Sequence, residues 1–175
     1  MRSMLIQPSD PGLSLREITE ADEPLLLAIY ASTREKEMTL VPQWSEAQKK
    51  AFLLQQFTAQ HAWYRQHYKG AFFYLIQRGA TTIGRLYVAP CYVDGTVRII
   101  DIALLPAHRN KGYGESLLKD IMTFAKSEGR NLTIHVESFN PAMRLYERLG
   151  FLLKDRKNEV YYLLEWECQQ QKLTA

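Results

Sequence analysis

The sequence predicts an α+β fold, in which a mixed and mostly antiparallel sheet of about seven strands is flanked by about four helices. Two features favour this class. Three strand-like segments follow one another with hairpin turn signals between them, which indicates an antiparallel meander. A strand, an amphipathic helix and a strand then follow over 101–137, which indicates a single parallel crossover. The length of 175 residues suits one domain over 1–175, with a core over about 13–168.

The first expected elements are a short strand and a helix. Residues 13–18 alternate partly between apolar and polar side chains, which is typical of a strand. Thr19 with Asp22 three residues later is a helix-starting pattern, and Pro24 lies in the first turn, where proline is tolerated. A helix is therefore expected over about 20–34.

The segment 35–44 is expected to interrupt the helical pattern, and a second helix should follow it. Ser45 and Gln48 form a capping-box signature, so this helix should run to about His67. The helix is rich in glutamine and aromatic residues but lacks the basic stripe that binding of single-stranded nucleic acid needs. Its aromatic residues are therefore interpreted as packing residues.

The meander and the C-terminal elements come next. The three strands of the meander are expected over 71–77, 81–90 and 96–105, with turns at Gly79 and at Asp94–Gly95. The following helix should have one apolar face, made up of Gly114, Leu117, Leu118, Ile121, Met122 and Ala125. Gly129 stands where this helix should end. The last elements are expected to be a strand over 131–137, a short helix over 140–150 and strands over 151–157 and 159–168.

The turn before the crossover helix predicts an anion-binding site. Gly112 and Gly114 stand where the helix begins, although glycine costs about 0.5–1 kcal/mol relative to alanine in a helix. Glycines without side chains let an anion approach the unpaired N–H groups of a helix N-terminus, and Arg109 and Lys111 add positive charge. The pattern R-x-x-G-x-G matches neither a Walker A motif nor the dinucleotide fingerprint. Taken alone, these glycines could equally serve tight packing between the strand and the helix.

Two motifs together resemble the GNAT superfamily of acyl-CoA N-acyltransferases. The segment IALLPAHRNKGYGESLL resembles the pyrophosphate-binding segment of that superfamily, and LTIHVESFNPAMRLYERLGF resembles its second hallmark. The resemblance covers about residues 13–168 and implies a GNAT-like fold. It implies an enzyme, an acetyl-CoA-dependent N-acetyltransferase that moves the acetyl group of acetyl-CoA to a primary amine by direct attack, with no metal. The alternative is a non-catalytic acyl-CoA-binding or sensing module.

The resemblance also implies a set of cofactor-binding residues. The main chain at Ile102, Ala103 and Leu104 should bind the pantetheine arm, and the Leu104 N–H should serve as the oxyanion donor. Asn140 should bind the pantetheine as well. The pyrophosphate should be held beside Arg109 by the main chain of Asn110, Lys111, Gly112, Tyr113, Gly114 and Glu115.

Tyr146 is the candidate general acid, because a phenol with an ordinary pKa near 10 holds its proton at neutral pH and can give it to the departing thiolate. It could instead be an ordinary packing residue. The base is left open among His135, Glu137, Asp101 and a water chain. His135 stands where many members of the superfamily have a glutamate. His135 could be a hydrogen-bonded strand histidine, and Asp101 could be paired structurally with Arg85 or Arg98.

The acceptor is implied to enter opposite the cofactor, under the first two helices and their connection. Acidic and aromatic side chains there would suit a cationic amine, although a solvated loop with one anchoring tryptophan explains them equally well. The candidate acceptor wall consists of Tyr30, Glu35, Glu37, Met38 and Trp44, and the candidate acceptor residues also include Glu137.

Charge, cysteine content and hydropathy limit the kinds of partner and the cellular compartment that are expected. The net charge of +3 comes from 22 basic and 19 acidic residues, which suits a small anionic ligand and argues against a nucleic-acid partner. Cys91 and Cys168 have no metal-ligand spacing and fit a reducing compartment. With no apolar run of membrane length, a cytoplasmic protein with no membrane contact is expected. Strand edges would permit a homodimer through the sheet.

Overall fold

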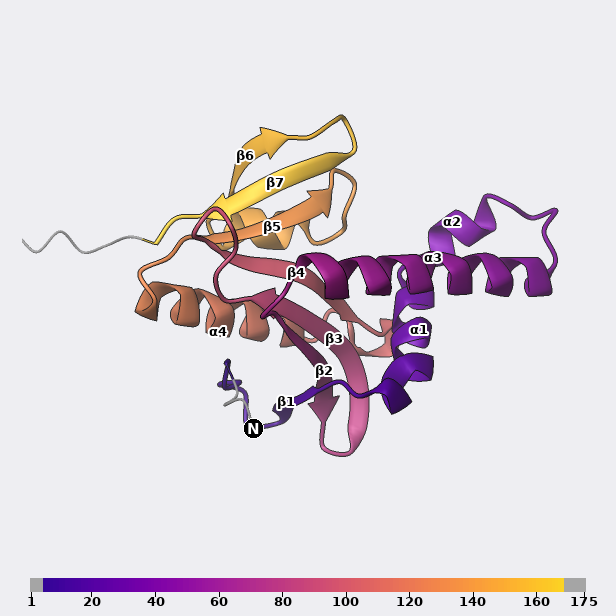
Figure 1. Cartoon of the computed structure of the whole chain (residues 1–175), viewed down its shortest axis with the longest axis horizontal. Coiled ribbons are helices and arrows are strands. Elements are labelled where there is room, and N and C mark those ends of the chain that lie inside the picture. The colour runs from indigo at the N-terminus through magenta and orange to yellow at the C-terminus, as the bar shows by residue number, and fades with distance from the viewer. Residues whose placement is uncertain (1–4, 169–175) are drawn as a thin grey trace, which may run out of the picture.

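Seven strands form one sheet, in which only one neighbouring pair is parallel among the described residues 5–168 of this computed structural model (Figure 1). The strands are β1 (Leu13–Glu17), β2 (Phe72–Arg78), β3 (Thr81–Ala89), β4 (Val97–Leu104), β5 (Leu132–Glu137), β6 (Leu152–Arg156) and β7 (Tyr161–Trp166). Their order in the sheet is β1-β2-β3-β4-β5-β7-β6. The predicted α+β class and the mostly antiparallel sheet are confirmed.

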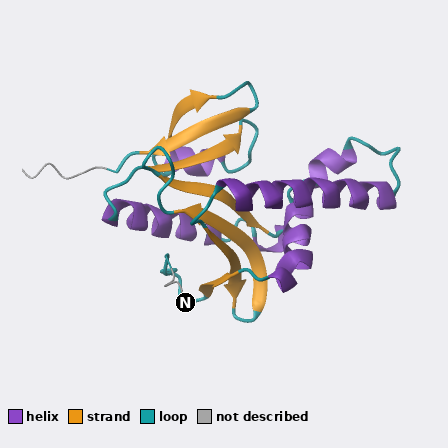
Figure 2. Ribbon diagram, viewed as in Figure 1, coloured by secondary structure: helices purple, strands orange, loops and turns teal. Residues whose placement is uncertain are grey.

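Helices cover both faces of this sheet (Figure 2). They are α1 (Glu23–Ser32), α2 (Glu35–Thr39), α3 (Glu46–His67), α4 (Tyr113–Ser127) and α5 (Met143–Arg148), with 3₁₀ turns at Glu20–Asp22 and Pro106–His108. The apolar residues of α4 and α5 pack on one face with the larger core cluster. Those of α1 and α3 pack on the other face, where Phe57 is fully buried.

The helix count differs from the expectation of about four, because α2 was not predicted. The segment 35–44 was interpreted only as an interruption, yet its first five residues form one helical turn. A single turn is too short to show a 3.6-residue apolar period, so no such pattern in the sequence predicts this helix. The helix expected over 20–34 is also shorter, because residues 20–22 form a 3₁₀ turn and the α-helix begins at Glu23 beside Pro24.

The capping box of α3 is formed as predicted. The backbone N–H of Gln48 donates to Ser45 Oγ at 3.2 Å, and the backbone N–H of Ser45 donates to Gln48 Oε1 at 2.8 Å. Although α3 has 22 residues, Phe57 is its one fully buried side chain among those described. The N-terminal half of α3, together with α2, extends beyond the sheet in Figure 1. The helix therefore covers the sheet with its C-terminal half.

A bulge in β4 and its short pairing with β5 open the middle of the sheet. Tyr87 lies opposite Asp101 and Val88 lies opposite Ile99, so Ile100 is an extra residue in β4. Strand β5 pairs with β4 only over 97–99. Beyond Ile99 the two strands no longer pair, and within residues 5–168 the edge of β4 over 101–104 has no strand partner on that side.

The buried carboxylate of Asp22 supports a stability prediction. It accepts hydrogen bonds from both terminal nitrogens of Arg16, at 2.9 and 2.7 Å, and from the Thr19 amide at 2.7 Å. The Arg16 guanidinium and the Thr19 amide hold the pKa of this carboxyl well below its usual range. Replacing Asp22 with Asn should cost about 1–3 kcal/mol of unfolding free energy at pH 7, because a charged acceptor is lost.

Thermal melting at pH 7 and pH 3 checks this expectation. The depressed folded-state pKa means that the contribution of Asp22 is fully present above the unfolded-state pKa of about 4 and is lost as pH falls toward the folded-state value. The difference in melting temperature between the natural protein and Asp22→Asn should therefore shrink at pH 3. Equal melting temperatures at pH 7 would contradict the prediction.

Candidate functional site

A cavity of about 530 Å³ opens along the unpaired edge of β4, between α4 and α5. It brings together these predicted site residues: Ile102, Ala103, Leu104, Arg109, Asn110, Gly112, Gly114, Glu115 and Tyr146. The side chains of Lys111, Tyr113 and Asn140 do not line it. It is also lined by Leu118, Pro141, Ala142, Arg144, Leu145 and Arg148, which the sequence reasoning missed. Arg144 and Arg148 are four residues apart on α5, a spacing that puts both on one helix face and could have flagged them.

The open edge of β4 presents main-chain hydrogen-bonding groups to this cavity. The Leu105 N–H donates to the carbonyl of Ile83 on β3 at 2.8 Å. Because antiparallel bonding alternates along a strand, the N–H groups of Ile102 and Leu104 point away from β3, toward the cavity. Arg109 Nε donates to the Leu104 carbonyl at 2.8 Å on the same side. An extended chain placed here can bind like an added strand.

The start of α4 forms the other end of the cavity. Gly112 precedes the helix with a φ of +83°, a left-handed conformation that strains any residue with a side chain. A Cβ on Gly114 would lie 3.8 Å from Leu104 Cδ1, which places this bare backbone beside the end of β4. The first N–H groups of the 15-residue α4 carry the positive end of the helix dipole. This end of the cavity therefore suits an anion such as a diphosphate.

Ion pairs surround the mouth of the cavity. Glu115 on α4 accepts from Arg148 of α5 at 2.6 Å and pairs with Lys119 at 2.9 Å. Lys119 and Arg148 lower the pKa of Glu115, so its carboxylate stays ionised and links the two helices. Arg109 Nη2 donates to the Ser32 carbonyl at 3.2 Å and so connects the end of β4 to the end of α1.

Tyr146 is buried on α5 with 3% of its surface exposed, and it lines the cavity. Its ring meets Phe151 edge-on at a centroid distance of 5.6 Å, so the residue also packs in the core. Burial, and secondly the negative charge of Asp101, raise the pKa of Tyr146 above its usual value. The phenol therefore holds its proton throughout the physiological range.

Asp101, one of the candidate bases, is paired with a buried arginine. Arg85 Nη2 donates to Asp101 Oδ2 at 2.5 Å and also to Gln60 Oε1 at 3.2 Å. The Arg85 side chain is 3% exposed and that of Asp101 17% exposed. The interpretation of Asp101 as a member of an Asp–Arg pair is confirmed, with Arg85 as the partner. The bulge at Ile100 turns Asp101 toward the α1 and α3 face.

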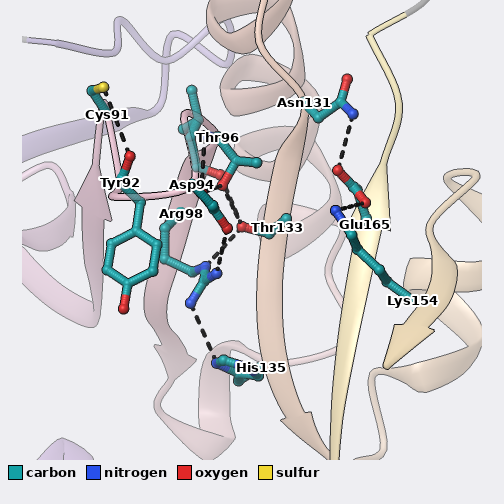
Figure 3. A network of polar contacts seen from close by, with 11 residues as sticks. Cys91, Tyr92, Asp94, Thr96, Arg98, Asn131, Thr133, His135, Lys154 and Glu165 are labelled. Atoms are coloured by element: carbon teal, nitrogen blue, oxygen red, sulfur yellow. Dashed lines mark hydrogen bonds and ion pairs between the residues drawn. The ribbon is translucent and has the colours of Figure 1, made fainter. Parts of the chain in front are cut away.

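His135, the second candidate base, lies beside a different arginine network (Figure 3). Arg98 Nη1 is 3.4 Å from His135 Nδ1, Arg98 Nε donates to Thr133 Oγ1 at 2.7 Å, and Arg98 Nη2 donates to Asp94 Oδ2 at 3.2 Å. Partial burial, followed by the charge of Arg98, lowers the pKa of His135. The imidazole is therefore neutral at pH 7, as a proton acceptor must be.

Glu137, the third candidate, meets the acceptor wall. Arg34 Nη1 donates to Glu137 Oε1 and to Glu37 Oε1, both at 3.1 Å. The Arg34 guanidinium also lies 5.4 Å from the centroid of the Tyr30 ring. The structure thus brings Tyr30, Glu37 and Glu137 together around one arginine.

The other acceptor candidates lie elsewhere. Glu35 is exposed and Met38 is half-buried on the short helix α2. Trp44 packs edge-on against Phe52 near the start of α3, at a centroid distance of 5.3 Å. The Met38 N–H donates to the Arg34 carbonyl at 3.0 Å, so Met38 contacts the backbone of Arg34, whereas the guanidinium bonds to Glu37 and Glu137.

Residues 5–168 contain no group of three or more His, Cys, Asp or Glu side chains that could hold a metal ion. Within the same range, none of the helices is long and apolar enough to cross a membrane.

Comparison with known proteins identifies sequence relatives. Residues 36–151 match the model of the Acetyltransferase (GNAT) family. The uncharacterized N-acetyltransferase CgeE of Bacillus subtilis (strain 168) is 31% identical over 80 residues, which cover 45% of this chain and 30% of that protein. The match thus spans less than a third of the length of that relative.

Similar solved structures share the fold. The PaiA N-acetyltransferase of Thermoplasma acidophilum, in complex with coenzyme A, has a TM-score of 0.65 and 16% identity, over 89% of this chain and 98% of that one. The spermidine N-acetyltransferase of Vibrio cholerae, in complex with coenzyme A and spermine, has a TM-score of 0.60 and 15% identity, over 90% and 96%. Naa50 of Arabidopsis thaliana, with a bisubstrate analogue, has a TM-score of 0.56 and 15% identity, over 89% and 99%.

Proposed function

Because residues 36–151 match its model, the chain belongs to the acetyltransferase (GNAT) family, and we propose that it moves the acetyl group of acetyl-CoA to a primary amine by direct attack. One observation carries this proposal. A single cavity connects the open edge of β4, the N-terminus of α4 and the buried side chain of Tyr146. An extended amide-bearing arm, a diphosphate and a leaving thiolate each require one of these three features.

Binding of the donor uses the main chain more than side chains. The N–H groups of Ile102 and Leu104 face the cavity and can pair with the pantetheine amides as an added strand would. The first N–H groups of α4 can bind the pyrophosphate, and Gly112 and Gly114 keep that backbone accessible. Asn140 acts indirectly in this proposal, because its Oδ1 accepts from the Ala142 amide at 2.8 Å and so positions the start of α5.

The chemical step forms a C–N bond and breaks a C–S bond. An uncharged amine attacks the thioester carbonyl, and the Leu104 N–H stabilises the charge that develops on the carbonyl oxygen. Tyr146 gives its proton to the departing thiolate, and the raised pKa keeps that proton in place beforehand.

Asp101 is our choice for the group that receives the amine proton. Asp101 directly precedes Ile102, Ala103 and Leu104, the residues of β4 that line the donor cavity. After burial, its negative charge is the second cause that raises the pKa of Tyr146. Its side chain remains 17% exposed, which leaves it accessible to a substrate or a water molecule. His135 and Glu137 are bound by Arg98 and Arg34 further along β5.

One observation favours the alternative, a non-catalytic acyl-CoA-binding or sensing module. Each of the three candidate bases contacts an arginine, namely Arg85, Arg98 or Arg34. An arginine partner stabilises the ionised form of a carboxylate and makes it a weaker proton acceptor. The module would bind acetyl-CoA in the same cavity without turnover.

Release of coenzyme A distinguishes the two functions. Thiol titration would follow acetyl-CoA with a panel of small amines, amino acids, aminoglycosides and peptide N-termini, and calorimetry would measure acetyl-CoA binding separately. Amine-dependent release supports the transferase. Tight binding without release for any amine supports the module, and no binding at all contradicts both.

The glycine-containing turn at the start of α4 gives a sharper prediction. Replacing Gly114 with valine should weaken acetyl-CoA binding by about tenfold or more, because the added methyl groups would project into the cavity beside Leu104. Calorimetry would measure the dissociation constant. Ser116→Val, on the same helix but outside the cavity lining, is the matched control for the helix propensity of valine. An unchanged dissociation constant in Gly114→Val would contradict a pyrophosphate position at this turn.

A further inference from the structure

We propose that Arg34 determines which acceptor charge the protein prefers. The natural site then selects an amine that carries one ammonium group in addition to the reacting nitrogen. The inference rests on the proposed acyl transfer, because it concerns the second substrate of that reaction. It names Arg34 as a specificity-determining residue, which the sequence patterns did not single out.

The acceptor has to approach from the face of the sheet that α1 covers. The cavity on the α4 and α5 side is the donor site, and the donor itself would fill it. Among the described residues, β5 pairs with β4 only over 97–99, so no ladder joins the two strands beyond Ile99. Glu137, the last residue of β5, is bonded to Arg34, the N-cap residue of α2.

The connection from the last residue of α1 to the start of α2 contacts the ends of both strands. Ser32 accepts from Arg109, which follows β4, and Arg34 donates to Glu137 on β5. Arg34 also binds Glu37 of α2, and its guanidinium lies 5.4 Å from the centroid of the Tyr30 ring of α1, so residues of α1, α2 and β5 meet there. An amine entering toward the thioester passes this group.

The charges of the group do not cancel. Two carboxylates, Glu37 and Glu137, share one Arg34 nitrogen at 3.1 Å each, which leaves one net negative charge. The attacking nitrogen of an acceptor must be uncharged, so this net charge matches one additional ammonium group on the acceptor. A second additional ammonium would be repelled by Arg34. Removing Arg34 leaves two unbalanced carboxylates, which match two additional ammonium groups.

Three amines that differ in charge test this rule. Butylamine, 1,4-diaminobutane and spermidine carry no, one and two ammonium groups besides the reacting one. The natural protein should have its highest kcat/KM with 1,4-diaminobutane. In Arg34→Ala the ratio of kcat/KM for spermidine to that for 1,4-diaminobutane should rise by about tenfold, and the rise should shrink at high salt.

Matched variants separate charge from structure. Arg34→Gln removes the charge but keeps a donor, and it should shift the ratio as Arg34→Ala does even if the alanine variant folds poorly. Arg34→Lys keeps the charge and should leave the ratio near its natural value. Lys36→Ala removes one positive charge from the exposed surface of α2 and should not change the ratio.

Calorimetric titration of the same amines into the protein saturated with coenzyme A measures their dissociation constants, and so tests the charge preference without turnover. If the amines bind with the expected charge order but no acetyl transfer occurs, the inference stands and the proposed function fails. If transfer occurs but the ratio is unchanged in Arg34→Ala and Arg34→Gln, or shifts equally in Lys36→Ala, the inference fails and the function stands. Failure of all three amines to bind would overturn the inference.

Discussion

Replacing Tyr146 with phenylalanine is expected to lower kcat by about 10²- to 10⁴-fold while the dissociation constant of acetyl-CoA stays within about threefold. The substitution removes only the hydroxyl, so the ring should still pack edge-on against Phe151 and still line the cavity. The lost group is the proposed proton donor to the departing thiolate. Steady-state kinetics on the best amine of the panel, with calorimetry for acetyl-CoA, would measure both quantities.

The pH dependence adds a second readout to this variant. Because burial raises the pKa of Tyr146, its ionisation should not limit kcat of the natural protein up to about pH 9. The half-buried Tyr162 of β7 offers a control, since Tyr162→Phe removes a hydroxyl outside the cavity and should leave kcat unchanged. An unchanged kcat in Tyr146→Phe would show that water or another group protonates the thiolate.

Local patterns in the sequence predicted most of the elements. The capping box at Ser45, the turn glycines Gly79 and Gly95 with positive φ, and the helix-ending Gly129 all stand where they were expected. Each of these features depends on residues within a few positions of one another. The apolar face of α4 was also predictable, because its period depends only on the helix itself.

The partners of the candidate bases were beyond such patterns. Arg34 and Glu137 are 103 residues apart, and Arg98 and His135 are 37 apart, so only the assembled sheet brings them together. The bulge at Ile100 was equally hidden, since an extra strand residue leaves no mark in an apolar run such as VRIIDIALL. Asp101 therefore stood out in the sequence as a carboxylate in an apolar strand, but its direction did not, and its partner was left open between Arg85 and Arg98.

These arginines stabilise carboxylates that the fold partly buries. The side chains of Asp101 and Glu137 are 17% and 23% exposed, so the charge of each needs a partner. Arg85 and Arg34 supply the compensating charge at Asp101 and Glu137, from β3 and from the start of α2 respectively. The same ion pairs link β3 to β4 and the start of α2 to β5, so the proposed acceptor side includes contacts that also stabilise the fold.

Gly84 is where we expect one added methyl group to have the largest effect on stability. This residue of β3 lies opposite Leu104 of β4, and a Cβ built on it would lie 2.2 Å from the Ala103 carbonyl oxygen and 2.9 Å from Leu104 Cδ2. Backbone oxygen cannot move aside as a flexible side chain can, so Gly84→Ala should cost about 2–4 kcal/mol of unfolding free energy. Chemical denaturation would measure this loss.

The direction of the strain connects this prediction to the site. Gly84→Ala must push residues 103–104 of β4 away from β3, toward the cavity that they line. Acetyl-CoA affinity should therefore fall even at temperatures where the variant remains folded.

Thr82→Ala, on the same strand and half-buried, serves as the control and should change neither the stability nor the acetyl-CoA affinity by more than a fraction of these amounts. Truncating Leu104 to alanine in the Gly84→Ala background should not restore stability, because the contact with the Ala103 oxygen would remain. A stability within about 0.5 kcal/mol of the natural protein would show that β3 and β4 can separate freely here, and that their close approach does not fix the edge on which the donor is proposed to bind.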